Sequence, residues 1–559
     1  MSQIVADRIE EVLKEISDII KKLNWPDLPI DLKPPIGDFA LVCFPAAKIL
    51  KLNPSDIAAE IASKVKHIGK IISAEPEKGY CNIVIDWDDI ATDVINEINQ
   101  KSYAKTGGEI ENILIEHTSA NPTGPFHMGR ARNPIIGDSI ARLLQYYGHN
   151  VDTEYYVNDT GRQAATLAFG LSDYKTNNKD KIDHELVEAY REASKLLEDN
   201  TEVRENIYKM MEDIEGGNSE VLQKVKNSAK RMLEGMKISL RRLGAEANSY
   251  YHESDLIANG KVGEVIESLK NSEICKEEDG AYYLDLEREN IAGRNQKFFF
   301  TRKNGLSLYT TRDIAYHLHK FTNYDKALNV LGEDHRLQSK LLGIALRELG
   351  SNEPIGLFYS FVNLPGGKMS TRAGRVVYLD DIMEKIVELA KNKLNETDLN
   401  NETKEELAEN IGIGSLRYNV LKVQAEKGFT FNIEDALNLQ GDSAPFAMYS
   451  HARAAAIIRN YNKDIPEIIL NEKLSTSEIT LLRTLSKWPD TVQRAVSNLS
   501  IHYIPNYVHE LASNFNQFYR DCPVIGHNNE QFRINLVFSS KIILNASLDI
   551  LGIKAPERM

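Results

Sequence analysis

The residues of this sequence best suited to chemistry first gather in a short turn, "NPTGPFHMGR" at 121–130. An apolar, strand-like run comes before the turn and a helical stretch follows it. This order places backbone N–H groups and the positive end of a helix dipole at a sheet edge, which attracts phosphate. Gly129 permits close approach to the backbone, while His127 and Arg130 can donate hydrogen bonds to phosphate oxygens. Taken alone, the turn fits a phosphate site and an ordinary helix start equally well.

A second candidate is the stretch "LPGGKMSTRAGRVVYLDD" at 364–381. Its glycines, together with Lys368, Arg372 and Arg375, predict a cationic loop that leads into a β-run. Such cations can follow a triphosphate as negative charge moves onto the departing pyrophosphate. By itself, however, the loop is better explained as a basic surface hairpin.

The elements that must position these residues alternate between strands and helices. A strand is predicted over 112–118, a helix over 131–149 and a second strand within 151–163. From Ala281 strand-like segments return and again alternate with helical ones. Strands that alternate with helices predict an α/β fold with a parallel sheet.

At 559 residues the chain is too long for a single core, and its pattern divides it into four regions. The predicted regions are an α+β N-terminal module at 1–105, a core at 106–172 and 281–380, a helical and mixed insertion at 173–280, and an all-α region at 381–559 whose own core starts near residue 445.

Composition excludes some classes of protein and leaves others open. No apolar run reaches the roughly 18 residues that span a bilayer, so no membrane partner is expected and a cytoplasmic location is predicted. The four cysteines are scattered, which favours buried thiols over a zinc site: Cys43, Cys81, Cys275 and Cys522. The net charge of −14 argues against a nucleic-acid partner, yet the segment from Pro445 onward has 12 Lys/Arg against 10 Asp/Glu. Charge therefore does not decide the question.

The turn and the loop together resemble the HIGH and KMSKS motifs of class I aminoacyl-tRNA synthetases, in that order. Segments along nearly the whole chain are similar to arginyl-tRNA synthetases: "EHTSANPTGPFHMGRARNPIIGD", "EYYVNDTGRQ", "GDSAPFAMYSHARAAAIIR" and "LGIKAPERM", with "GDFALVCFPAAKILKLNPSDIAAEIASKV" similar to the N-terminal module of that family. The resemblance implies a Rossmann catalytic core, an N-terminal module on the tRNA elbow and a helical anticodon-binding domain. It also implies an ATP-dependent ligase, usually monomeric, that uses MgATP and joins L-arginine to tRNA(Arg) through arginyl-adenylate.

The resemblance also assigns roles to individual residues. For ATP and catalysis it implies His127, Gly129, Lys368, Met369 and Ser370, with no resident metal, and we add Arg130 and Arg372 as cations for the triphosphate. For arginine it implies Asn121, Glu253, Tyr309, Asp313 and Gln338. Because a guanidinium favours carboxylates, Asp313 is the first choice for its partner. For tRNA it implies Phe39, Tyr449, Arg453 and Arg459.

The sequence departs from the family pattern at three positions. Thr371 replaces the second lysine of KMSKS, and Gly124 stands where some relatives carry a compensating lysine. Arg130 replaces the last histidine of HIGH, so we hypothesise that Arg130 and the cations of the loop neutralise the triphosphate. These departures leave open weak activity, or activity that depends on bound tRNA.

Three other functions remain as alternatives. They are a class I synthetase for another amino acid, a small-molecule adenylyltransferase and a non-catalytic tRNA-binding paralogue. The acids near the expected amino-acid site argue against a synthetase for another amino acid. The long helical region after residue 380 argues against a small-molecule adenylyltransferase, and the intact motif residues argue against a non-catalytic paralogue.

Overall fold

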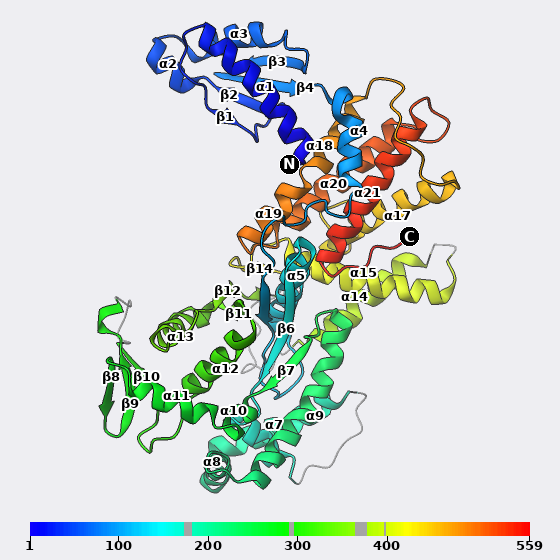
Figure 1. The fold of residues 1–559 in the computed structure, drawn as a ribbon. Helices are drawn as coiled ribbons and strands as arrows, with labels where there is room; N and C mark the ends of the chain where they lie inside the picture. The colour runs from blue at the N-terminus through cyan, green and yellow to red at the C-terminus, as the bar shows by residue number, and fades with distance from the viewer. Residues whose placement is uncertain (173–180, 290–295, 364–376, 396–398) are drawn as a thin grey trace.

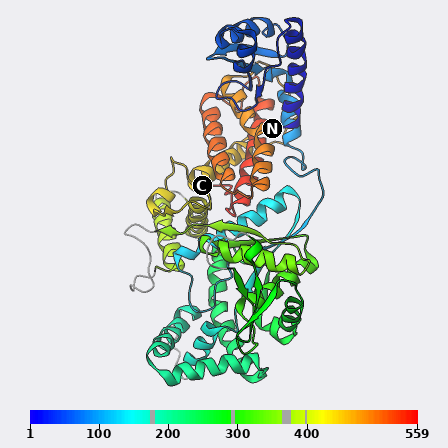
Figure 2. The same cartoon turned by 90° about the vertical axis from the view of Figure 1, so that its left-hand side faces the viewer.

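The fold is taken from a computed structural model that describes residues 1–172, 181–289, 296–363, 377–395 and 399–559. Figures 1 and 2 show an elongated molecule. The N-terminal module lies at one end, the C-terminal helices lie beside it, and the parallel sheet with its inserted helices forms the other end.

The N-terminal module packs an antiparallel sheet of order β1-β2-β4-β3 against helices. Helix α1 buries Val5, Ile9, Val12 and Ile16, which recur at helical spacing along one face. Phe39 lies in the middle of this core with no exposed surface, so the expected contact of its side chain with tRNA is wrong for this structure. The elements are α1 (Gln3–Lys22), β1 (Ile30–Asp31), β2 (Phe39–Val42), α2 (Phe44–Leu50), α3 (Pro54–Val65), β3 (Ile71–Glu77), β4 (Tyr80–Ile85) and α4 (Trp87–Ile98).

A five-stranded sheet of order β12-β11-β5-β6-β7 forms the core of the next part. All four strand pairs are parallel, which confirms the predicted α/β class. The elements are β5 (Asn112–Glu116), η1 (Met128–Arg130), α5 (Arg132–Tyr147), β6 (Asn150–Val157), α6 (Arg162–Gly170), β7 (Ser249–His252), α12 (Tyr309–Asn323), β11 (Lys326–Gly332), η3 (Glu333–His335), α13 (Arg336–Glu348) and β12 (Ile355–Tyr359).

The membership of the parallel sheet differs from the prediction in two places. Strand β7 lies within the predicted insertion but pairs with β6 in the core sheet. Of the segments predicted as core strands after Ala281, "AYYLDL" and "KFFFTR" instead form strands of a separate antiparallel sheet of order β10-β9-β8, whereas "KALNVLG" and "IGLFY" do join the core sheet as β11 and β12. Asp279 and Gly280 both have positive φ between β8 and β9, as in the tight turns that join antiparallel strands. The inserted elements are α7 (Ile182–Asp199), α8 (Thr201–Glu215), α9 (Ser219–Leu243), α10 (Glu253–Ala258), α11 (Lys261–Lys270), β8 (Cys275–Glu278), β9 (Ala281–Asp285), η2 (Glu287–Glu289) and β10 (Lys297–Phe299).

Helices dominate the described chain after residue 377, as predicted. The remaining elements are β13 (Val362–Asn363), α14 (Leu379–Leu394), α15 (Asn401–Leu421), β14 (Phe429–Thr430), α16 (Ile433–Ala436), α17 (Ala444–Tyr461), α18 (Thr476–Ser486), α19 (Trp488–Ser497), α20 (Tyr503–Asp521) and α21 (Glu530–Ile550). Within the described ranges, none of these or the earlier helices combines the length and apolar character needed to cross a bilayer.

Arg417 of α15 joins three parts of the fold. Its fully buried guanidinium pairs with Asp138 of α5 and donates to the carbonyl oxygens of Leu243, at 2.9 Å, and Leu551, at 2.7 Å. We expect Arg417→Met to lower the free energy of unfolding by about 3–5 kcal/mol, because these carbonyls lose their buried donor and Asp138 keeps only its pair with Arg142. Urea unfolding followed by circular dichroism measures the change. Arg241→Ala, which breaks an exposed pair with Glu246, is the control and should cost about 1 kcal/mol or less; equal unfolding midpoints for the two variants would contradict the prediction.

Candidate active site

The turn at 121–130 and the segment after the basic loop are paired through their backbones. Met128 N–H donates to the carbonyl of Val377 at 3.1 Å, and Leu379 N–H donates to the carbonyl of Phe126 at 2.8 Å. Tyr378 thus lies opposite His127 in an antiparallel bridge. The turn and the segment 377–379, which are distant in sequence, therefore share one wall of a site.

A pocket of about 380 Å³ opens beside this wall. It is lined by Ala120, Asn121, Thr123, Gly124, Pro125, Phe126, His127, Arg130, Val187, Tyr190, Arg191, Met236 and Tyr378. None of these residues is acidic, although the chain carries a net charge of −14. Two guanidinium groups and a histidine without an acid favour an anionic ligand such as a phosphate chain.

His127 is neutral over the physiological pH range. Burial lowers its pKa to about 4, and the neighbouring Arg130 adds to the shift. A neutral imidazole keeps one N–H group, which can donate to a phosphate oxygen. Arg130 follows in η1 with its side chain exposed, so it can reach an occupant of the pocket.

Next to the pocket, three segments meet at the carboxyl edge of the parallel sheet. Asn121, beyond β5, donates to Gln163 Oε1 at 2.7 Å, and the adjacent Arg162 N–H donates to the hydroxyl of Tyr309 at 3.4 Å. Tyr309 begins α12, and Asp313 follows one turn later on the same helix. Through the adjacent Arg162 and Gln163, the structure therefore brings the segment of Asn121 to the first turns of α12, which carry Tyr309 and Asp313.

A chain of polar contacts orients Asp313. Lys320 donates to the Nε2 of His317 at 3.2 Å, so the Nδ1 of that histidine carries the proton. This Nδ1 lies 3.1 Å from Asp313 Oδ1 and 2.8 Å from the carbonyl oxygen of Asp313. Lys320 also donates to Glu116 Oε2 at 2.6 Å, at the carboxyl end of β5. The sequence analysis did not single out Glu116, although a carboxylate at the end of an otherwise apolar strand could have indicated a site residue.

Glu253 lies against an arginine of the chain. Its carboxylate is buried and accepts from Arg312 Nη1 at 2.8 Å. Burial raises the pKa of Glu253, and Arg312 opposes that shift. Arg312 already pairs with Oε1 of this carboxylate, while Oε2 is buried without a hydrogen-bond partner among the described residues, so the role of Glu253 toward the substrate's amino group stays a prediction. Gln338 lies exposed in the first turn of α13, beyond β11.

Four of the predicted site residues lie outside the described residues: Lys368, Met369, Ser370 and Arg372. Among the described residues, Asp183, His184 and Asp380 lie close enough together to hold a metal ion. The ammonium of Lys181 is already there, 3.1 Å from Asp183 Oδ2 and 2.7 Å from Asp380 Oδ2. This lysine supplies the positive charge that the two acids require, so the cluster is an ion-pair network.

In the C-terminal helices, Arg453 lies between two exposed tyrosines. Its guanidinium is 4.7 Å from the ring centre of Tyr449 on α17 and 4.5 Å from that of Tyr519 on α20. Such a platform can stack bases and pair with phosphates. Arg459 lies two turns further along α17 and donates to the carbonyl of Glu557 at 3.3 Å.

The chain matches three known domain families. Residues 93–433 match the catalytic domain described as tRNA synthetases class I (R), and residues 447–559 match the DALR anticodon binding domain. Residues 3–85 match the arginyl tRNA synthetase N terminal domain. Together with the parallel sheet and the paired motifs, these matches define a class I aminoacyl-tRNA synthetase.

Full-length relatives specify the family further. The chain is 36% identical to an arginine–tRNA ligase of Methanocaldococcus jannaschii, over 99% of this chain and 100% of the relative. It is 39% identical to that of Methanocella arvoryzae, over 92% of each chain. Its structure matches the arginyl-tRNA synthetase of Thermus thermophilus with a TM-score of 0.79 and 25% identity, over 99% of each chain. The chain belongs to the arginyl-tRNA synthetase family.

Proposed function

We propose that this chain joins L-arginine to tRNA(Arg) in two steps at the carboxyl edge of the sheet. The arginine carboxylate attacks the α-phosphorus of ATP, the bond to the bridging oxygen breaks, and pyrophosphate leaves with the electron pair. A hydroxyl of the terminal ribose of tRNA then attacks the arginyl carbonyl and AMP leaves. The observation that carries the proposal is the acid-free, cationic pocket directly beside the Asn121, Tyr309 and Asp313 site.

Alignment and charge stabilisation are the main work of the protein in this reaction. The triphosphate lies in the pocket, where His127 donates its N–H and Arg130 supplies positive charge. Gly129 lies buried between His127 and Arg130 in η1 and does not line the pocket itself, so its ATP role rests on the family motif. Magnesium enters with ATP as MgATP. Lys368, Met369 and Ser370 retain the ATP roles that the family motif implies, and Arg372 retains that of a cation for the triphosphate.

Arginine is selected by the groups around Asp313. The carboxylate accepts from the guanidinium of the substrate, and Tyr309 packs beside it on the same face of α12. Asn121 and Gln338 hold the other end of the amino acid. Lysine and citrulline leave part of this array unpaired, at about 1–3 kcal/mol per lost group, so both should be poor substrates.

ATP–pyrophosphate exchange with a panel of amino acids, with and without total tRNA, tests the proposal. We expect exchange with arginine and only in the presence of tRNA. Exchange with a different amino acid would assign the chain to another specificity. Exchange with none, together with retained tRNA binding, would favour a non-catalytic tRNA-binding protein.

The Arg453 platform is proposed to contact the anticodon loop. We expect Arg453→Ala to raise the KM for tRNA by about tenfold, because stacking and a phosphate contact are lost, while the KM values for ATP and arginine stay within twofold. Aminoacylation kinetics measure this change. Arg494→Ala is the matched control, because Arg494 stacks on Tyr503 at 4.7 Å near the other end of α20. If both variants raise the KM for tRNA equally, the platform has no special role.

A further inference from the structure

Helix α7 of the insertion occupies the space beside Gly124. A Cβ atom at this glycine would lie 2.6 Å from Val187 Cγ2, far inside contact distance. A lysine at position 124, the compensating residue of some relatives, therefore cannot be accommodated unless the Val187 side chain or α7 itself moves. The missing positive charge has to come from another element.

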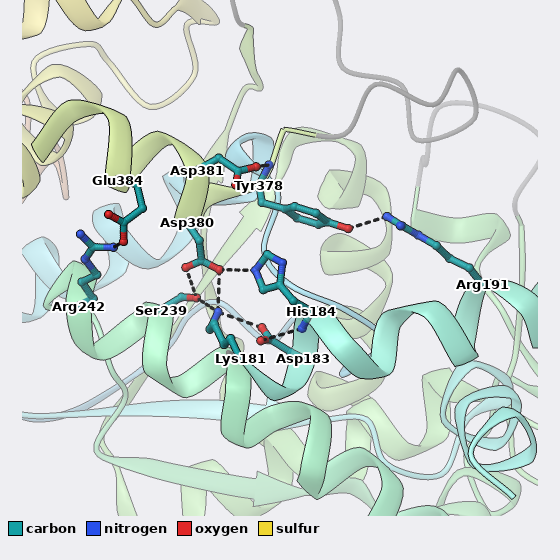
Figure 3. Close-up of polar contacts among 10 residues, drawn as sticks. All are labelled: Lys181, Asp183, His184, Arg191, Ser239, Arg242, Tyr378, Asp380, Asp381 and Glu384. Atoms are coloured by element: carbon teal, nitrogen blue, oxygen red, sulfur yellow. Dashed lines mark hydrogen bonds and ion pairs between the residues drawn. The ribbon is translucent and has the colours of Figure 1, made fainter. Parts of the chain in front are cut away.

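Helix α7 itself brings a cation to the pocket. His184, Val187 and Arg191 recur at helical spacing on one face of α7, and Arg191 lines the same pocket as His127 and Arg130. Within the described parts of the chain, no carboxylate lies within ion-pair distance of Arg191. Its guanidinium donates to the hydroxyl of Tyr378 at 2.6 Å, as Figure 3 shows. An arginine that has no acidic partner among the described residues, beside a pocket whose described lining contains no acid, is suited to a phosphate chain.

Hydrogen bonds to Asp380 anchor the start of α7, the helix that carries Arg191. Asp380, in the first turn of α14, accepts from Lys181 at 2.7 Å, from His184 at 2.8 Å and from Ser239 at 2.7 Å (Figure 3). Although burial opposes it, the hydrogen bonds from His184 and Lys181 hold the pKa of Asp380 well below its usual range, so it stays ionised.

The side chain of Tyr378 connects the segment 377–380 to α7. It packs edge-on against His184 with ring centres 4.8 Å apart, while its hydroxyl accepts from Arg191. The backbone of Tyr378 also bridges to His127. One tyrosine thus sets the position of Arg191 relative to His127, and this preorganisation distinguishes Arg191 from a freely rotating surface arginine.

We propose that Arg191 binds the β- and γ-phosphates of ATP and stabilises the departing pyrophosphate. From the inserted helix it supplies the positive charge that Gly124 and Thr371 do not. This inference rests on the proposed function, because it requires the pocket to be the ATP site. It adds an ATP-binding residue from an element outside both sequence motifs.

Aminoacylation kinetics with purified, full-length Arg191→Ala test this assignment. We expect kcat/KM for ATP to fall by about 10- to 100-fold, with the KM for arginine within twofold. Arg191→Lys should recover part of the loss, since a lysine keeps the charge without the planar fork. Arg231→Ala is the control, because Arg231 is an exposed arginine of the insertion on α9, and it should behave as wild type.

Product inhibition separates phosphate binding from a merely structural role. In Arg191→Ala the inhibition constant for pyrophosphate should rise by about tenfold, while that for AMP, which lacks the β- and γ-phosphates, should not change. An unchanged kcat/KM for ATP overturns the inference, and so does an equal rise for pyrophosphate and AMP. The proposed function fails on a different result, namely wild-type protein that does not charge tRNA with arginine.

Discussion

Replacing Asp313 with asparagine is expected to lower kcat/KM for arginine by about 100- to 1000-fold. The substitution keeps the size of the side chain but removes the negative charge that pairs with the guanidinium of the substrate. The N–H of His317, held at 3.1 Å from Asp313 Oδ1, then orients a neutral amide in place of a carboxylate. The loss should therefore fall on arginine, and kcat/KM for ATP at saturating arginine should change much less.

Steady-state aminoacylation at varied arginine measures this effect. Asp279→Asn is the matched control, because Asp279 forms an exposed ion pair with Lys303 at 3.0 Å on the small antiparallel sheet. Asparagine also tolerates the positive φ of that position. The control should stay within twofold of wild type. A variant Asp313→Asn that charges arginine normally would move the guanidinium partner to another acid.

Sequence reasoning predicted the location of residues that lie at the carboxyl edge of the sheet. Asn121, beyond β5, and Tyr309, at the start of α12, lie at the carboxyl edge because parallel strands all end there. The prediction that Phe39 contacts tRNA was wrong because the side chain of Phe39 is buried. A motif position says which strand a residue belongs to, but the burial of its side chain depends on which face of the sheet the helices cover.

Residues that reach the site through tertiary packing could not be predicted. Arg191 lies in a polar, charged helix whose sequence contains no sign of the turn at 121–130. It enters the pocket because Gly124 lets α7 approach and because Asp380 anchors that helix. Likewise, the partner of Glu253 was unknown until the fold placed Arg312 against it. Such pairings depend on the arrangement of elements, which local patterns do not encode.

Replacing His127 with alanine should slow arginyl-adenylate formation about 100-fold, because a donor to the charged phosphate chain is lost from a preorganised site. His127→Asn should recover part of the rate through its amide N–H. Since burial lowers the pKa of His127 to about 4, the imidazole stays neutral above about pH 5. The pH profile of kcat/KM for ATP, which reports the free enzyme and the free substrate, should thus have the same shape between about pH 5.5 and 8 in wild type and in His127→Asn. Rapid-quench measurement of adenylate at each pH provides the test; an inflection near pH 6.5 that disappears in His127→Asn would show that this histidine acts as a titrating acid or base.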